Sequence, residues 1–204
     1  MSEAHLTPRR NLLEHPFYRR WVAGDLSTDE LRYYACQYAH VVSALPGWLR
    51  RAAAVTPANA AELNRHAAEE DTHIALWHEF AHALDITEDE LAAAAPNAAT
   101  ADLLRRGEEL SGQPSGVAVA WALEAQTPAV SAEKLSGLKA HYGIGSENGA
   151  EYFEVHSALD VVHTAELDDV IAGLDEDQVV AAQRTADAVL DGLWDLLTSA
   201  ERAA

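Results

Sequence analysis

Apolar positions recur every three to four residues over most of the chain, which is the spacing of a helix with one buried face. Ser27, followed three residues later by Glu30, forms a capping box, a common start of a helix. Pro46 and Gly47 fall inside the helix that follows, and we expect them to bend it rather than end it, because the apolar pattern resumes directly after them. The apolar side chains that define this helix are Leu31, Tyr34, Cys36, Tyr38, Val41 and Val42.

The rest of the chain predicts further helices separated by short breaks. Pro57 is placed in the first turn of the next helix, which runs to about residue 84. Thr87 and Glu90 form a second capping box, which opens a short helix that Pro96 closes. Later helices are expected over about 100–110, from 117 to about 142 with an interruption at Pro128, over about 148–174, and over 175–203.

Strand signals are few, because β-branched runs with a two-residue alternation are rare. The chain has 204 residues, which is within the range of one ordinary domain. We therefore predict an all-α fold in which residues 1–204 form a single-domain bundle of seven to eight helices. In such bundles the ligand site lies between the helices.

Composition and charge exclude several classes of partner. Lys and Arg number 14 against 33 Asp and Glu, for a formal net charge of -19, which repels phosphate backbones and anionic headgroups. We expect no nucleic acid or membrane partner. No apolar run approaches the ~18 residues of a membrane span, and the first residues lack the apolar core of a signal peptide, so we expect a cytoplasmic protein. Cys36 is the one cysteine, which excludes an intrachain disulfide and a cysteine-based metal cluster.

Three residues in the last third of the chain combine metal-binding side chains with helical spacing. Asp160 lies four residues after His156 and three before His163, so at about 100° per residue all three fall on one narrow stripe of a helix. They can therefore converge on a common point. Because burying such a stripe without a cation or polar partners would be costly, we interpret it as part of a metal site.

A second cluster consists of Glu69, Glu70 and His73. Glu70 and His73 are three residues apart, the spacing with which helical di-iron proteins present a carboxylate and an imidazole toward the bundle interior. Glu69 is four residues from His73 and can reach the same side of the helix. The sequence leaves both glutamates open as the first ligand, and we prefer Glu70.

A third element is Glu124, a carboxylate in the middle of an otherwise apolar helix. Together with the two clusters it gives three carboxylates and three imidazoles. This mixture of oxygen and nitrogen donors suits two iron or manganese ions, whereas zinc clusters and copper(I) favour thiolates.

One motif points to a different chemistry. The segment from His78 through Glu79 to His82 matches the HExxH pattern of zinc metalloproteases. However, His78 lies five residues after His73, which turns it by about 140° to the other side of the helix. The extension with a glycine and a third histidine is missing, so we interpret His78 and His82 as a solvated surface pair.

The same residues lie in a pattern that resembles the CADD-like branch of the haem-oxygenase-like di-iron oxidases, relatives of the TenA and PqqC folds. The resemblance covers most of the chain and implies a haem-oxygenase-like bundle. In that family a Glu, a His, a second Glu and a terminal His-xxx-Asp-xx-His bind the metals. The loop often found between the first Glu and His is shortened here. The matching stretches are His15-Pro16-Phe17-Tyr18 with Trp21, Leu31-Arg32 with Tyr34, Tyr38 and Pro46, Glu69-Glu70 with His73 and Leu76-Trp77, Glu124 with Gln126, Pro128, Lys134, Gly137-Leu138 and Tyr142-Gly143, and Tyr152-Phe153 with His156, Asp160, His163 and Glu166.

What the resemblance implies is an oxidase that activates O2 at two iron ions, or at one manganese and one iron. In the CADD-like branch the product is para-aminobenzoate, formed from an internal tyrosine with a lysine as the nitrogen source. The matching positions are Tyr18 and Lys134, and Lys134 is one of two lysines in the chain. A further tyrosine of that branch is Leu123 here, which departs from the family's pattern.

Two alternatives stay open at this stage. The first is an oxidase for an external fatty acid or amino acid, and the second is a TenA-like thiamin-salvage hydrolase with Cys36 as its catalytic thiol. We also expect a homodimer, with an external electron donor as a further partner. Tyr38, Gln126 and Tyr152 are expected to orient the ligands.

Overall fold

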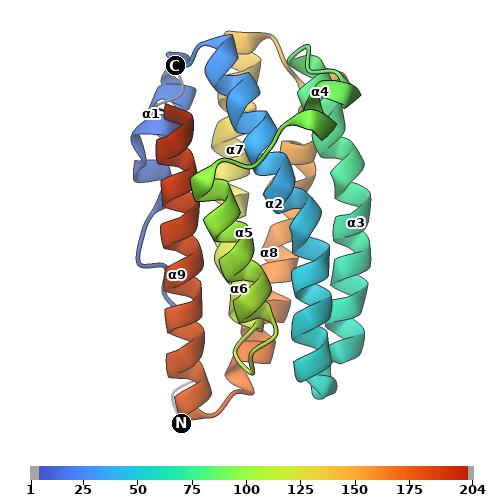
Figure 1. The fold of residues 1–204 in the computed structure, drawn as a ribbon, viewed down its shortest axis with the longest axis vertical. Helices are drawn as coiled ribbons and strands as arrows, with labels where there is room; N and C mark the ends of the chain where they lie inside the picture. Colours follow the sequence, from blue (N-terminus) through green and yellow to red (C-terminus); the bar gives the residue numbers. More distant parts are fainter. Residues whose placement is uncertain (1–4, 202–204) are drawn as a thin grey trace.

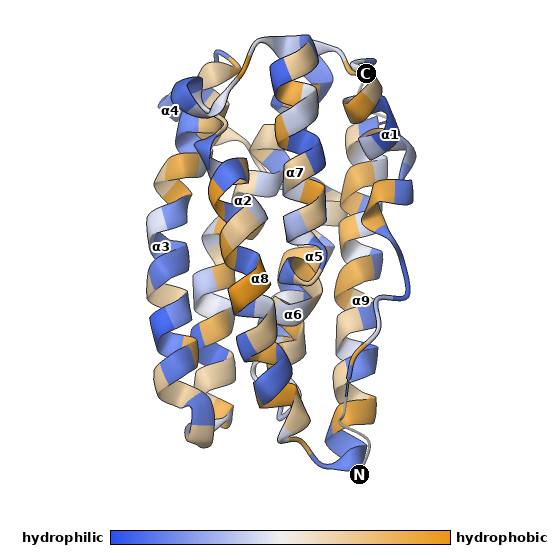
Figure 2. Cartoon of the chain, turned by 180° about the vertical axis from the view of Figure 1, so that it is seen from behind, coloured by the Kyte–Doolittle hydropathy of each residue, from blue (hydrophilic) through white to orange (hydrophobic). Residues whose placement is uncertain are grey.

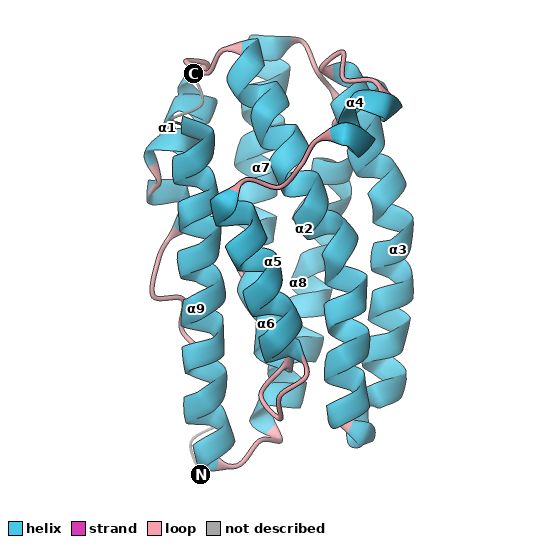
Figure 3. Cartoon of the chain, viewed as in Figure 1, coloured by secondary structure: helices cyan, strands magenta, loops and turns pink. Residues whose placement is uncertain are grey.

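In a computed structural model, which describes residues 5–201, helices account for the regular structure and no strand occurs over that range (Figure 3). The long helices run side by side along one direction (Figure 1). The all-α prediction is confirmed. The helices are α1 (Pro16–Ala23), α2 (Thr28–Val55), α3 (Ala60–Ala83), α4 (Glu88–Ala93), α5 (Ala98–Ser111), α6 (Val117–Glu124), α7 (Thr127–Gly137), α8 (Glu151–Ala172) and α9 (Glu176–Glu201).

Helix starts and interruptions follow the local signals. Both predicted capping boxes are present, at Ser27 before α2 and at Thr87 before α4. Pro46 lies inside α2, which continues through it to Val55. Pro57 opens a single 3-10 turn, so α3 begins three residues later than predicted. For α9, the predicted residues 202 and 203 lie outside the described residues.

Helix α1 is an element that the sequence analysis did not name. Its start is fixed by His15, whose Nδ1 accepts a hydrogen bond from the backbone N–H of Phe17 at 3.0 Å, with Pro16 in the first turn. It ends at Gly24, whose φ of 75° suits glycine. These local signals were available in the sequence. The helix matters for the site because it carries the buried side chain of Tyr18.

Packing joins the helices around one hydrophobic cluster. Helix α2 packs along α3, α7 packs along α8, and α9 covers α5 and α6. Every residue of α6 is buried, which fits its almost wholly apolar sequence. On the long helices hydrophobic and hydrophilic residues occur together, as expected for helices with one buried face (Figure 2). Over residues 5–201, no helix has both the length and the hydropathy needed to cross a membrane.

Two glycines inside helices should respond oppositely to alanine. A Cβ at Gly107 of α5 would overlap the buried indole ring of Trp48, whereas nothing lies within 4 Å of a Cβ at Gly47 of α2. We expect Gly107→Ala to lower the free energy of unfolding by about 2 kcal/mol or more. Gly47→Ala should raise it by up to ~1 kcal/mol through helix propensity. Chemical denaturation of both variants checks this, and equal effects would contradict it.

Candidate metal centre

Helices α3, α6 and α8 bring the six preferred candidate ligands together. Glu70 and His73 come from α3, Glu124 from α6, and His156, Asp160 and His163 from α8; all are buried. The donor atoms are close. Oε1 of Glu70 lies 3.0 Å from Nδ1 of His73, and Oε2 of Glu70 lies 3.6 Å from Nε2 of His156.

His163 faces the middle of this cluster. Its Nδ1 lies 3.7 Å from Glu70, 3.8 Å from Glu124 and 3.7 Å from Asp160. One nitrogen thus stands at nearly equal distances from carboxylates on three helices. The helical stripe predicted on α8 therefore does point into the bundle, where the other two helices meet it.

Glu69 lies outside the cluster and contacts it through His163. Its side chain is 36% exposed, whereas that of Glu70 is 3% exposed. Oε2 of Glu69 lies 2.9 Å from Nε2 of His163, and its other oxygen lies 2.7 Å from Nη1 of Arg65. When Nε2 donates its proton to Glu69, Nδ1 of His163 keeps its lone pair for the cluster. The structure thus distinguishes Glu70, which faces the cluster, from Glu69, which does not. The sequence alone left both open as the first ligand.

A seventh residue, His66 of α3, reaches the cluster although the sequence analysis did not select it. Its Nε2 lies 3.0 Å from Oε1 of Glu124, and its ring centroid lies 3.7 Å from that of His163. The side chain is 1% exposed. A signal was present in the sequence: His66, Glu70 and His73 repeat the His-xxx-acid-xx-His spacing found on α8.

The cluster leaves buried polar atoms without hydrogen-bond partners among the described residues. They include both oxygens of Glu124 and of Asp160, Nε2 of His66, Nε2 of His156 and Nδ1 of His163. Buried polar groups almost always have partners, so this concentration of lone pairs calls for a cation. Carboxylates mixed with imidazoles suit iron or manganese. The residues therefore fit the metal centre that the sequence predicts.

The pKa shifts of the three buried carboxylates agree with a metal centre at this cluster. Burial raises the pKa of Glu124 and of Asp160, and the negative charge of neighbouring carboxylates raises both further. Burial also acts to raise the pKa of Glu70, but the neighbouring imidazoles of His156 and His73 outweigh it and lower that pKa. The cluster without a cation therefore carries protons on carboxylates. Because a cation must displace these protons, its affinity should increase with pH.

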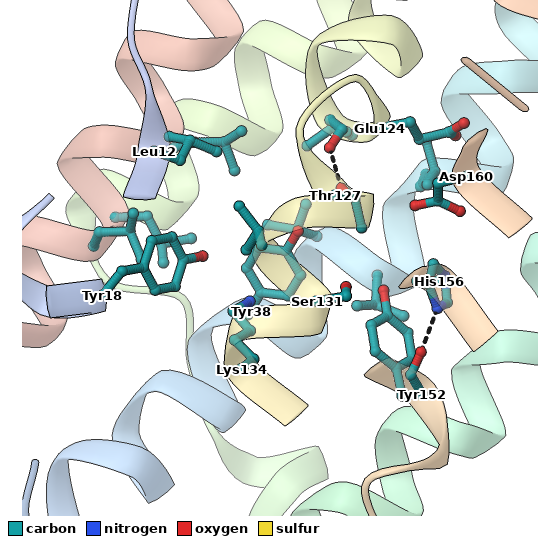
Figure 4. Close-up of a pocket in the computed structure, with 18 of the residues that line it drawn as sticks. Leu12, Tyr18, Tyr38, Glu124, Thr127, Ser131, Lys134, Tyr152, His156 and Asp160 are labelled. Carbon is teal, nitrogen blue, oxygen red and sulfur yellow. Dashed lines mark hydrogen bonds between the residues drawn. The ribbon is translucent and has the colours of Figure 1, made fainter. Parts of the chain in front are cut away.

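A narrow cavity of about 30 Å³ adjoins the cluster. Glu124, His156 and Asp160 line one end, and Tyr18 and Lys134 line the other (Figure 4). The cavity therefore leaves room for small molecules beside the cluster.

Lys134 of α7 is buried among aromatic rings. Its Nζ lies 4.9 Å from the ring centroid of Tyr18 and 5.2 Å from that of Tyr38, and it donates a hydrogen bond to the hydroxyl of Tyr34 at 2.6 Å. Burial lowers the pKa of Lys134 to about 7 and raises that of Tyr18. A substantial fraction of Lys134 is therefore a neutral amine near neutral pH.

The three residues expected to orient the ligands, Tyr38, Gln126 and Tyr152, make different contacts. The backbone carbonyl of Tyr152 accepts a hydrogen bond from Nδ1 of His156 at 2.7 Å, which leaves Nε2 facing Glu70. Tyr38 lines the cavity. The expectation for Gln126 was wrong, because its side chain instead binds the backbone of Arg10 and Leu12 and fixes the segment before α1.

Two other candidates lie away from the cluster. His78 and His82 are both partly exposed, and each lies 3.2 Å from an oxygen of Glu88 at the start of α4. This matches the surface pair expected from the sequence. Cys36 is not among the described residues that line the cavity, and burial raises the pKa of its thiol. A protonated thiol outside the cavity gives no support to a hydrolase that uses cysteine.

Comparisons with known proteins agree with the fold and the cluster. The sequence profile of a family described as iron-containing redox enzymes, of haem-oxygenase type, matches residues 32–197. The 4-aminobenzoate synthase of Chlamydia pneumoniae is 31% identical over 202 residues, covering 93% of this chain and 89% of that protein.

Two solved structures share the fold. A TenA homologue from Pseudomonas syringae superposes with a TM-score of 0.82 at 17% identity, covering 94% of this chain and 86% of that one. A CADD-like protein from Nostoc punctiforme superposes with a TM-score of 0.76 at 19% identity, covering 95% and 90%. At these identities the likeness concerns the fold alone.

The helical fold and the buried carboxylate and histidine cluster define an all-α oxidoreductase of the haem-oxygenase-like class. The chain belongs to the family of iron-containing redox enzymes, as the match over residues 32–197 shows. The predicted resemblance to this family, and to its CADD-like and TenA-like members, is confirmed.

Proposed function

We propose that the protein is an O2-dependent oxidase that forms 4-aminobenzoate from its own side chains. Tyr18 supplies the ring and Lys134 the nitrogen. The name of the relative from Chlamydia pneumoniae supports the product, and the positions of the two side chains support their roles. The residues that would bind two iron ions, or one manganese and one iron, are Glu70, His73, Glu124, His156, Asp160 and His163. When bound, these ions would supply the redox chemistry that activates O2.

The observation that carries this proposal is that Tyr18 and Lys134 line the same small cavity as Glu124, His156 and Asp160. At about 30 Å³ the cavity has room for a molecule the size of O2. The reactive groups that line it together with the candidate ligands are thus side chains of the protein itself. This favours internal side chains over the external substrates that the sequence left open.

The surrounding residues fit these roles. Tyr18 is 4% exposed and Lys134 is 5% exposed, so both reacting groups are shielded from water. Aromatic rings on several sides hold the Lys134 amine in place. Burial lowers its pKa, so a fraction of the molecules carries Lys134 as a neutral amine, the form that acts as a nucleophile. The hydrogen bond to Tyr34 directs one of its protons away from Tyr18.

The test is a single turnover observed by mass spectrometry. The chain is loaded with Fe(II) without oxygen, exposed to O2 with and without ascorbate as electron donor, and both the polypeptide and the small molecules are analysed. We expect 4-aminobenzoate together with a loss of mass at Tyr18. The variant Tyr18→Phe should release none and keep its mass. An unchanged polypeptide that consumes added decanoate or an amino acid would overturn the proposal.

A further inference from the structure

We propose that His66 is a seventh metal ligand, which makes the centre richer in nitrogen than the six-residue set given above. The inference rests on the proposed function, because it concerns the same ions. It departs from the carboxylate and histidine pattern to which the sequence was compared, since that pattern has no histidine at this place.

The first support is a symmetry between two helices. On α3, Glu70 lies four residues after His66 and three before His73, and on α8 the stripe of His156, Asp160 and His163 has the same spacing. Each triplet covers two helical turns on one face. The stripes meet in opposite directions: His66 lies beside His163, with ring centroids 3.7 Å apart, and His73 lies beside His156, at 4.6 Å.

The symmetry gives two ends of similar composition. At one end, donor atoms of His66, Glu124 and His163 all lie within 4.8 Å of one another. At the other end the same holds for Glu70, His73 and His156. Two imidazoles and one carboxylate thus stand at each end. Asp160, Glu70 and His163 form a third group whose donor atoms lie within the same distance of one another. Without His66, the Glu124 end would have a single imidazole.

The second support is the state of the atoms at the Glu124 end. Nε2 of His66 lies 3.0 Å from Oε1 of Glu124, yet neither atom makes a hydrogen bond with any described residue. The other oxygen of Glu124 and Nδ1 of His163 also lack partners, and they lie 3.8 Å apart. A histidine that served only to pack the core would be expected to use its nitrogen in a hydrogen bond. A shared cation satisfies all of these atoms at once.

The consequence is a preference between metals. Imidazole donors suit iron, whereas carboxylate donors suit manganese better. Two imidazoles against one carboxylate therefore favour Fe(II) over Mn(II) at the end that holds His66. Replacing this imidazole with a carboxylate, as in His66→Glu, should retain two ions and shift the bound ratio toward manganese.

The first experiment counts ions. Wild type and His66→Leu are titrated with Fe(II) without oxygen, and bound iron is measured after gel filtration. His82→Leu is the matched control, because His82 lies on the same helix and is half exposed. We expect two ions in the wild type and in His82→Leu, and one in His66→Leu, with the affinity for the second at least ~100-fold weaker. Two ions at unchanged affinity in His66→Leu would overturn the role of His66.

The second experiment uses the unaltered chain, so it does not depend on the folding of a variant. The protein is labelled with 15N-histidine and saturated with Zn(II), and the ring nitrogens are observed by NMR. Of the ten histidines, four should show metal-bound nitrogens, namely His66, His73, His156 and His163. Three would overturn the inference and leave the proposed function intact. A wild type that binds neither Fe(II) nor Zn(II) would overturn both.

Discussion

Replacing Glu70 with alanine should abolish tight iron binding, whereas the same change at Glu69 should weaken it by about 10–100-fold. Glu70 is buried and contacts His73, His156 and His163, so its loss removes a donor that two of the candidate donor groups share. Glu69 is partly exposed and contacts the cluster through Nε2 of His163. It positions a ligand, and partners of this kind are typically worth that smaller factor.

The measurement is anaerobic titration with Fe(II), with bound iron quantified in each variant. Neither change should raise the thermal midpoint of the metal-free chain, because neighbouring groups lower the pKa of both Glu70 and Glu69, so the folded chain favours both carboxylates. If Glu69→Ala lost all iron and Glu70→Ala kept it, the assignment would have to be reversed.

Replacing Lys134 with methionine should abolish formation of 4-aminobenzoate and, in the same variant, stabilise the fold. The product requires the Lys134 nitrogen under the proposed function, so no residual yield is expected. The stabilisation follows from burial, which lowers the pKa of Lys134 from 10.5 to about 7. Because the pKa of Lys134 is lower in the folded chain than in the unfolded chain, burying the protonated amine lowers the free energy of unfolding. This loss of stability is complete at a pH where Lys134 is protonated in both the folded and the unfolded chain.

The sign of this effect sets its dependence on pH. Below pH 7 both states of the wild type bind the proton, and Lys134→Met should gain about 3–5 kcal/mol. Between pH 7 and 10.5 the unfolded chain keeps the proton that the folded chain has lost, so the gain shrinks and at pH 9 is about half as large. Urea unfolding of metal-free wild type and variant at pH 6 and pH 9 measures this difference.

Lys139 provides the matched control, because it is the other lysine and is exposed. Lys139→Met should leave both the yield of 4-aminobenzoate and the stability nearly unchanged. A product that still forms in Lys134→Met, with nitrogen from another source, would contradict the role given to Lys134. A gain in stability that grew between pH 6 and pH 9 would contradict the buried, neutral amine.

The sequence by itself determined the helices and one face of the centre. Capping boxes at Ser27 and Thr87 and the apolar spacing are local signals, and helices depend on local signals because each hydrogen bond spans four residues. The stripe of His156, Asp160 and His163 could be predicted for the same reason. The repeat of this stripe on α3, formed by His66, Glu70 and His73, is equally local and could be predicted from the sequence in the same way.

The tertiary structure decided everything that depends on how helices turn toward one another. Glu69 and Glu70 differ by about 100° around α3, and only the contact of α3 with α8 determines that Glu70 faces the centre while Glu69 holds His163 from outside. It also brought Tyr18 of α1 against Lys134 of α7, more than a hundred residues apart, at a cavity that the candidate ligands line as well. Helical spacing fixes which side chains share a face, but packing between helices fixes what that face meets.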